Sequence, residues 1–322
     1  MEIDIVIPWV NPEDNVWFEK YKTACSLYKG DKNPERIRDF GLFKYWWRCI
    51  AENAKWVRKI HLLLDNKSQI PNWLNINHPK IKIHYHNEFI DENYLPTFNS
   101  NIFFAYCYKL EDLTENFIYL NDDMFITNKT EMSDFFINDK PVDTSIKSNQ
   151  INSNPTHEAF LNKLGIKFLN GRQRLDFFQN IVYNDLKLAE KYTKKFNIYK
   201  NVHVGITAKK SEVEKIFTDL KTDLIKLNKP NDKFRQSYNV NSDWLYRYIR
   251  LNLGTYTESN LQDFAYIESH NNNYKDIMLL IMNKKLVCIN DCLYKQDNFD
   301  FIKKYLNEFF NIKFSNKSEF EI

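Results

Sequence analysis

Residues 3–10 read Ile-Asp-Ile-Val-Ile-Pro-Trp-Val, a nearly continuous apolar run that is rich in β-branched residues. Such a run is typical of a parallel strand that is covered on both faces of its sheet. The segment after it, Asn11-Pro-Glu-Asp14, can begin a helix through residues 15–28. The chain therefore opens with a strand and a helix, as α/β folds do.

The same alternation continues along the chain. Apolar residues at helical spacing predict helices over 42–54 and 98–111, and short apolar runs predict strands at 57–64, 81–85 and 116–120. Strands that alternate with helices in this way predict an α/β fold with a mostly parallel sheet.

The character of the sequence changes after about residue 140. The segments that follow predict helices over 155–165, 172–196, 210–227 and 240–252, a strand over 286–290 and a helix over 298–310. We therefore expect a single unit over 1–322. It would comprise an α/β core over 1–140, a mainly helical lobe over 141–285, and a C-terminal strand and helix over 286–322 that pack back on the core.

The composition excludes several classes of protein. The chain has 322 residues with 45 basic and 42 acidic side chains, a net charge of +3, so the charge balance argues against a nucleic-acid-binding protein. Its 25 Phe, 19 Tyr and 7 Trp argue against intrinsic disorder. No apolar run approaches the length of a transmembrane helix, and the start of the chain does not resemble a secretory signal.

Cysteine and glycine counts narrow the chemistry further. Five cysteines, an odd number, predict reduced thiols and a cytoplasmic location. Cys288 and Cys292 lack a second Cys/His pair at matching spacing, so we expect no structural zinc. With six glycines and no glycine-rich phosphate loop, a phosphate site would have to use arginine, lysine, a metal ion or a helix N-terminus.

The stretch Leu120-Asn-Asp-Asp-Met124 is the most informative motif. Asn121, Asp122 and Asp123 follow the strand predicted at 116–120, and ligands of open α/β sheets bind at the carboxyl ends of the strands. Two adjacent carboxylates repel each other unless a cation compensates, and Mg²⁺ or Mn²⁺ held with a substrate diphosphate would do so. The alternative is a solvated turn, because Asn and Asp favour turns.

Other single residues have two readings each. Trp9 could stack on a base or belong to the core, and Arg38 could bind phosphate or form an ion pair. His203 could transfer a proton or be structural. Arg235 is ambiguous from its surroundings alone.

Taken together and in this order, four stretches resemble the Stealth family of sugar-phosphate transferases. The four are Ile3–Asp14; Arg38–Met124; His203 with Phe234-Arg235 and Ser242–Tyr246; and Cys288–Asp291 with Lys317–Glu321. The family includes bacterial capsule phosphotransferases and an animal N-acetylglucosamine-1-phosphotransferase. The third stretch departs from the family, because His203-Val-Gly lacks the proline of the common His-x-Pro.

The resemblance implies a GT-A-like nucleotide-sugar core and transfer of a sugar-1-phosphate. A hydroxyl of an oligosaccharide or lipid-linked glycan would attack the phosphorus that bears the sugar of a UDP-sugar, and UMP would leave. It also implies a role in capsule or surface-polysaccharide synthesis at the inner face of the cell membrane, and the lobe over 141–285 would lie on the acceptor side. Peripheral membrane association and the oligomeric state stay open.

The resemblance also implies roles for individual residues. Asp122 and Asp123 would hold Mg²⁺ or Mn²⁺, with Asp291 completing the ligand set, and Asp123 would also act in catalysis. Arg235 and Arg38 would neutralise phosphate. His203 would be the general base on the acceptor hydroxyl or would orient it, and an aspartate such as Asp123 or Asp291 is the next candidate base. Trp9, Asn11 and Asn121 would line the nucleotide side. Two other functions remain as alternatives: a metal-dependent glycosyltransferase that releases UDP, and a nonenzymatic glycan- or nucleic-acid-binding protein.

Overall fold

The computed structural model describes residues 1–146, 177–195, 197–199, 202–203, 205–259, 263–269, 274–291 and 296–322. The strands are β1 (Ile3–Pro8), β2 (Ile60–Leu64), β3 (Ile81–Tyr85), β4 (Asn116–Tyr119), β5 (Met124–Ile126), β6 (Phe136–Ile137), β7 (Lys140–Asp143), β8 (Ile206–Lys209), β9 (Thr257–Glu258), β10 (Phe264–Glu268) and β11 (Leu286–Asn290). The α-helices are α1 (Asn15–Leu27), α2 (Phe43–Asn53), α3 (His86–Phe89), α5 (Phe177–Thr193), α6 (Lys210–Asp219), α7 (Lys221–Leu227), α8 (Ser242–Leu253), α9 (Tyr274–Asn283) and α10 (Gln296–Lys313).

The main sheet has the strand order β3-β2-β1-β4-β8. β1 lies at its centre and pairs in parallel with β2 and β4, whereas β8 runs antiparallel at one edge. The predicted α/β class with a mostly parallel sheet is therefore confirmed, and the sheet with its helices is consistent with a GT-A-like core and a helical lobe.

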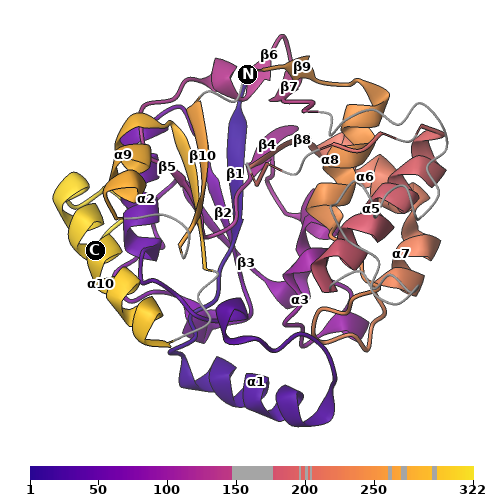
Figure 1. Cartoon of the computed structure of the whole chain (residues 1–322), viewed down its shortest axis with the longest axis horizontal. Coiled ribbons are helices and arrows are strands. Elements are labelled where there is room, and N and C mark those ends of the chain that lie inside the picture. The colour runs from indigo at the N-terminus through magenta and orange to yellow at the C-terminus, as the bar shows by residue number, and fades with distance from the viewer. Residues whose placement is uncertain are drawn as a thin grey trace, which may run out of the picture.

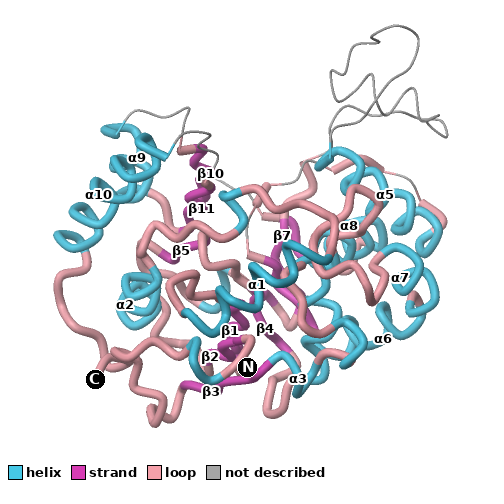
Figure 2. Tube along the Cα trace, turned by 90° about the horizontal axis from the view of Figure 1, so that it is seen from below, coloured by secondary structure: helices cyan, strands magenta, loops and turns pink. Residues whose placement is uncertain are grey.

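Helices cover both faces of this sheet. In Figure 1, α2, α9 and α10 lie on one side of β1, and α5 to α8 lie on the other; Figure 2 shows the same two groups from below. Successive side chains of a strand point to opposite faces. Accordingly, Ile5 and Ile7 of β1 join the core on the α2 side, while Val6 between them joins the core on the α8 side. The continuous apolar run at the start of the chain was needed to fill both cores.

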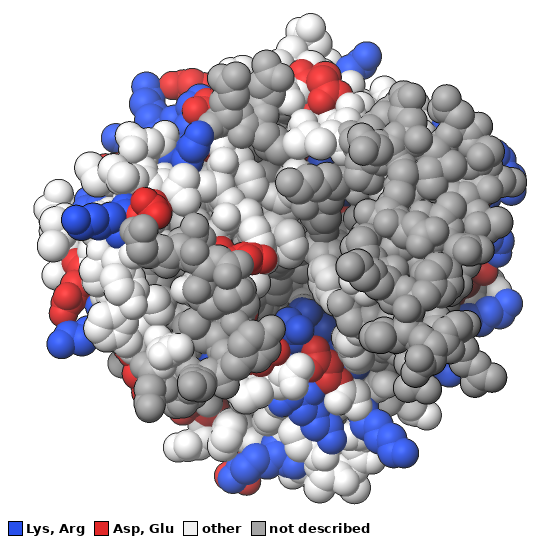
Figure 3. Space-filling view, in the orientation of Figure 1, with Lys and Arg blue, Asp and Glu red and all other residues white. Residues whose placement is uncertain are grey.

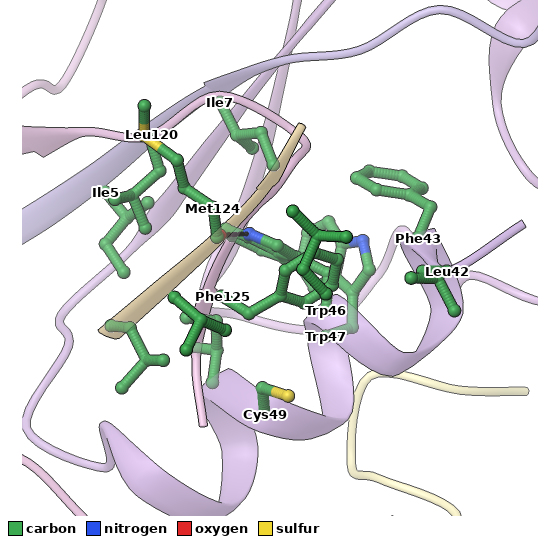
Figure 4. Packing of buried hydrophobic residues seen from close by; sticks show 14 of the residues in the cluster. Ile5, Ile7, Leu42, Phe43, Trp46, Trp47, Cys49, Leu120, Met124 and Phe125 are labelled. Atoms are coloured by element: carbon green, nitrogen blue, oxygen red, sulfur yellow. Dashed lines mark hydrogen bonds between the residues drawn. The ribbon is translucent and has the colours of Figure 1, made fainter. Parts of the chain in front are cut away.

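Helix α2 packs directly beneath the turn that follows β4. Trp46 and Trp47 are fully buried there, against Ile5, Leu120 and their neighbours (Figure 4). The Trp46 indole Nε1–H donates to the carbonyl oxygen of Met124 over 2.9 Å, the bond drawn in Figure 4. A tryptophan that is buried and hydrogen-bonded at its polar atom holds the backbone it contacts in place. This contact therefore fixes the end of the turn that carries the two aspartates.

A second sheet continues from that turn. Its strand order is β10-β11-β5, with β11 parallel to β10 and antiparallel to β5. The Ile289 N–H of β11 donates to the carbonyl oxygen of Asp123 over 2.8 Å. The C-terminal part of the chain thus lies against the turn between β4 and β5.

Some elements differ from the prediction. Residues 98–111 were expected to form an α-helix, but Ser100–Lys109 form a 3₁₀ helix. The single helix expected over 210–227 is divided at Leu220, whose backbone leaves the helical region. Strands β5 to β10 were not predicted, because most have only two to four residues, too few to show a period of two. The helix expected over 155–165 lies outside the described residues.

No helix in the described parts of the chain is both long and apolar enough to cross a membrane.

One buried ion cluster joins the helical lobe to the strands. The Asp143 carboxylate at the end of β7 accepts hydrogen bonds from Arg247 Nε and Nη2, at 2.8–3.1 Å, and from Arg250. All three side chains are almost fully buried. Arg250 also donates to the carbonyl oxygen of Thr207 in β8. The two guanidinium groups hold the pKa of Asp143 below its usual range despite its burial.

We expect Asp143→Asn to destabilise the fold by about 3–5 kcal/mol, because it removes the charge that compensates two buried guanidinium groups. Urea unfolding with an unchanged m-value would measure this. Asp139→Asn is the matched control, since Asp139 pairs with Lys209 at an exposed position and should cost about 1 kcal/mol or less. Equal midpoints for the two variants would contradict the prediction.

Candidate functional site

The two aspartates lie immediately beyond β4, where the sequence predicts them. Asp123 is half-buried, and its Oδ2 accepts from the Cys288 thiol over 3.4 Å. Its other carboxylate oxygen, Oδ1, is buried and has no hydrogen-bond partner among the described residues. A buried carboxylate oxygen without a donor is costly, so it marks a position where a ligand would be stabilising.

The surroundings oppose negative charge on both aspartates. Asp122 keeps access to solvent, but the protein atoms crowded around its carboxylate displace water and raise its pKa to about 8, helped by the nearby charges of Asp123 and Asp39. Desolvation likewise raises the pKa of Asp123 to about 6, although the Cys288 hydrogen bond and the charge of Arg235 act in the opposite direction. Perturbed carboxylates of this kind are typical of functional sites.

Arg235 is the cation that the structure brings to these carboxylates. Its Nη2–H donates to the Ser100 hydroxyl over 2.5 Å. Burial, followed by the charge of Arg36, lowers its pKa to about 10, so it remains charged at neutral pH. Its positive charge lowers the pKa values of both Asp123 and Asp243. The predicted residues Arg235, Asp122 and Asp123 therefore belong to one electrostatic cluster.

Asp243 belongs to the same cluster and was missed in the sequence. It is 6% exposed in the first turn of α8, where burial raises its pKa to about 6, the charge of Asp123 acts in the same direction, and that of Arg235 opposes it. An acidic residue in a first helical turn is ordinarily explained by the helix dipole. The only signal for a further role was that it follows Arg235 by eight residues within the matched stretch.

The donor set fits a divalent cation that is shared with a substrate. Among the described residues, no three His, Cys, Asp or Glu side chains form a group that could hold a metal ion by themselves. Mg²⁺, however, is commonly bound by one or two carboxylates, with water and substrate phosphate as the other ligands. Asp122 and the free Oδ1 of Asp123 supply such oxygens, and their raised pKa values are those of carboxylates without a compensating charge.

Arg38 and Asp291, predicted to bind phosphate and metal, lie together. Arg38 Nε and Nη2 donate to the two carboxylate oxygens of Asp291 over 2.8 and 2.9 Å. The Arg38 guanidinium also lies over the ring of Phe299, with 4.6 Å to its centroid. The fork of the guanidinium thus uses both oxygens of Asp291, and each charge is compensated by the other.

Trp9, Asn11 and Asn121 occupy structural positions beside the cluster. The Trp9 ring stacks on Phe43 with centroids 4.2 Å apart, so one of its faces is covered. Asn11 is held by Gln69, whose Oε1 accepts from the Asn11 N–H over 2.6 Å. The carbonyl oxygen of Asn121 accepts from the Met124 N–H over 3.0 Å, which closes the turn.

His203 lies in an aromatic environment. Its ring meets Trp244 at 5.1 Å and Tyr266 at 4.5 Å between centroids, and its φ of 44° is in the left-handed region. Burial lowers its pKa to about 4, so the imidazole is neutral at pH 7. It contacts Trp244, the residue that follows Asp243 on α8, which links it to the helix of the carboxylate cluster.

The surface reflects this mixture of charges. Figure 3 shows acidic and basic side chains close together in the lower middle of the face, near the position that α1 has at the bottom of Figure 1. The charges of Asp123, Asp243 and Arg235 act on one another, and Asp122 adjoins them in the turn after β4.

Comparisons with known proteins agree with this arrangement. Residues 36–143, from before Arg38 to Asp143, match the model of Stealth protein CR2, conserved region 2. The chain is 33% identical over 336 residues to the capsular polysaccharide phosphotransferase WcwK of Streptococcus pneumoniae, covering 99% of this chain and 98% of that protein. It is 31% identical to the exopolysaccharide phosphotransferase cps2G of Lactiplantibacillus plantarum, covering 99% and 96%.

A third relative is the receptor polysaccharide phosphotransferase WefC of Streptococcus gordonii, 30% identical with 100% of this chain and 99% of that protein covered. These matches extend over essentially the whole chain and include the cluster of Asp122, Asp123, Arg235 and Asp243. The chain therefore belongs to the Stealth family of proteins, which the sequence motifs had indicated.

Proposed function

We propose that this protein transfers a sugar-1-phosphate from a UDP-sugar to a hydroxyl group of a glycan acceptor during capsule or surface-polysaccharide synthesis. The acceptor oxygen forms a bond to the phosphorus that bears the sugar, the bond from that phosphorus to the oxygen of the leaving UMP breaks, and the hydroxyl proton passes to a base. The observation that carries the proposal is the similarity, over nearly the full length, to relatives named as polysaccharide phosphotransferases.

Phosphoryl transfer needs positioning and charge stabilisation more than covalent help from the protein. In the proposal, Asp122 and Asp123 hold Mg²⁺ or Mn²⁺, which when bound neutralises the donor diphosphate. Arg235 directs its guanidinium at the phosphoryl oxygens from a desolvated position, where its charge acts most strongly. Trp9, Asn11 and Asn121 border the nucleotide. Arg38 and Asp291 act as a pair in which Arg38 orients Asp291.

The proton acceptor is assigned to His203 in this proposal. Its neutral ring has an accepting nitrogen at pH 7. A pKa of about 4 makes it a weak base, which is compatible with a loose transition state in which the hydroxyl keeps its proton until late. Asp243, with a pKa of about 6 beside Arg235, is the carboxylate alternative.

We further propose that the protein works on the cytoplasmic side of the cell membrane, where nucleotide sugars are made and where a lipid-linked acceptor would lie. The odd number of five cysteines, for which we expect reduced thiols, supports an intracellular setting.

The leaving nucleotide tests the proposed function directly. Purified protein with Mg²⁺, a glycan acceptor and a panel of UDP-sugars should accumulate UMP, measured by ion-exchange chromatography, and the product should contain phosphorus. Stoichiometric UDP with a phosphorus-free product would instead establish a glycosyltransferase, which attacks the sugar carbon with the same donor.

Removal of the metal ion, or of Asp123 as one of its ligands, should strongly slow turnover. We expect excess EDTA, or Asp123→Asn in the presence of Mg²⁺, to lower the rate of UMP release by roughly 10²-fold or more, because an electrostatic group at the reacting phosphate is lost. Asp139→Asn, the same substitution at an exposed and remote position, should retain wild-type rates. Full activity in EDTA would refute the metal requirement.

Arg235→Lys should fold normally yet lose most turnover, on the order of 10²-fold in kcat, because an ammonium group cannot reproduce the paired donors of the guanidinium fork. Thermal unfolding would verify the fold, and single-turnover kinetics would locate the loss in the chemical step. Wild-type kinetics in this variant would reassign Arg235 to a structural role through Ser100.

A further inference from the structure

A cavity of about 410 Å³ lies next to the backbone of Arg235, and the proposed function assigns no role to it. One wall comes from the loop after α1, with Asp31, Lys32, Asn33 and Arg36, and the other from the first described residues of α5, Phe177 and Phe178. Its volume falls in the range of about 300–1,000 Å³ that small-molecule sites occupy.

The loop that lines the cavity is hydrogen-bonded to the backbone of Arg235. The Asp31 N–H donates to the carbonyl oxygen of Arg235 over 2.9 Å. Gly30, with a φ of 140°, approaches so closely that a Cβ there would lie 2.6 Å from the Phe234 Cβ and 2.8 Å from that same carbonyl oxygen. Only glycine permits both this backbone conformation and this approach. A ligand in the cavity therefore lies next to the backbone of Arg235, the residue whose charge acts on Asp123 and Asp243.

The lining is suited to a neutral polar ring. The Arg36 guanidinium already pairs with Asp31 over 2.6 Å, and the Lys32 ammonium already donates to the carbonyl oxygen of Cys25 over 2.7 Å. Both cations of the lining therefore already have a hydrogen-bond partner on the protein. What remains are fixed polar groups for hydroxyls and two aromatic rings, Phe177 and Phe178, that are 36% and 43% exposed.

Ring contacts link Phe178 in the cavity to His203, the predicted general base. The Phe178 ring meets Trp244 edge-on at 5.0 Å, and Trp244 in turn meets His203 at 5.1 Å between centroids. The cavity is therefore connected on one side to Arg235 and on the other to His203. In the proposed function, the acceptor hydroxyl reacts with Arg235 placed at the phosphate and His203 acting as the base.

We propose that this cavity binds one sugar ring of the glycan acceptor and so presents the acceptor hydroxyl to the phosphoryl group. Apolar ring faces of a hexose would pack on Phe177 and Phe178, and its hydroxyls would bond to Asn33 and the Asp31–Arg36 pair. The inference rests on the proposed function, because it names the acceptor side of the same reaction.

The kinetic test uses two substitutions at exposed positions. Phe177→Ala removes a stacking face, and Asn33→Trp fills the cavity from a loop residue whose side chain makes no capping hydrogen bond. Each should raise the KM for the acceptor about tenfold or more while changing the KM for the UDP-sugar by less than about twofold. Phe301→Ala, at an exposed phenylalanine of α10, is the matched control and should leave both constants unchanged. A rise in the donor KM instead, or no change in either constant, would overturn the assignment.

A binding test separates this inference from the proposed function. Saturation-transfer-difference NMR, with the methyl glycosides of glucose, galactose, rhamnose and N-acetylglucosamine added one at a time without donor, should detect binding of at least one glycoside to the wild-type protein. That signal should disappear in Asn33→Trp and persist in Phe301→Ala. If no glycoside gives a signal that depends on Asn33→Trp, the cavity is not a sugar site, whichever nucleotide the enzyme releases. If binding behaves as expected but no UMP forms, the sugar site stands and the proposed reaction fails.

Discussion

The hydrogen bond from the Trp46 indole to the Met124 carbonyl oxygen holds the part of the structure on which the site depends. The chain must turn sharply after β4 and re-enter a second sheet as β5, and the two aspartates sit in that turn. The buried tryptophan and the Ile289 N–H of β11 donate to the carbonyl oxygens of Met124 and Asp123, and so fix the backbone where this short segment ends. The backbone that carries the two carboxylates is therefore fixed, so their side chains stay close to each other. A cation that binds there would favour their charged forms.

The electrostatics follow from that rigidity. Desolvation raises the pKa values of Asp122, Asp123 and Asp243, and the positive charge of Arg235 opposes this increase at Asp123 and Asp243. The stable ion cluster at Asp143 shows the contrast, because two guanidinium groups there hold the carboxylate pKa low. In the structural cluster the carboxylate is held in its charged form by the protein, whereas the site favours protonation of its carboxylates. A cationic ligand would shift these carboxylates toward the charged form.

The sequence predicted β1, β2, β3 and β4 of the central sheet because each lies in a short apolar run, but it did not predict β8 at the edge. It predicted Asp122 and Asp123 because strand ends locate ligand sites in such sheets. It missed β5 to β10, which are mostly two to four residues long and are stabilised by partners distant in the chain. Asp243 was hidden for a similar reason, since only tertiary packing brings the first turn of α8 to Arg235. The cavity at Asp31 and Phe177 joins segments more than 140 positions apart, which no local pattern reveals.

Arg235 connects the two halves of the site, and its position explains why the reaction proposed here needs both. Its carbonyl oxygen anchors the loop of the cavity, while its charge lowers the pKa values of Asp123 and Asp243. In the proposed reaction, this one residue would relate the place of the sugar ring to the place of the phosphoryl group. In phosphoryl transfer the attacking and leaving oxygens must be roughly in line, and a displacement of about 1 Å can cost on the order of 10²-fold in rate. A single rigid residue that borders both substrates limits such a displacement more effectively than two residues on separately moving segments. The backbone and side chain of Arg235 would therefore contribute to catalysis by different means, the first by orientation and the second by charge.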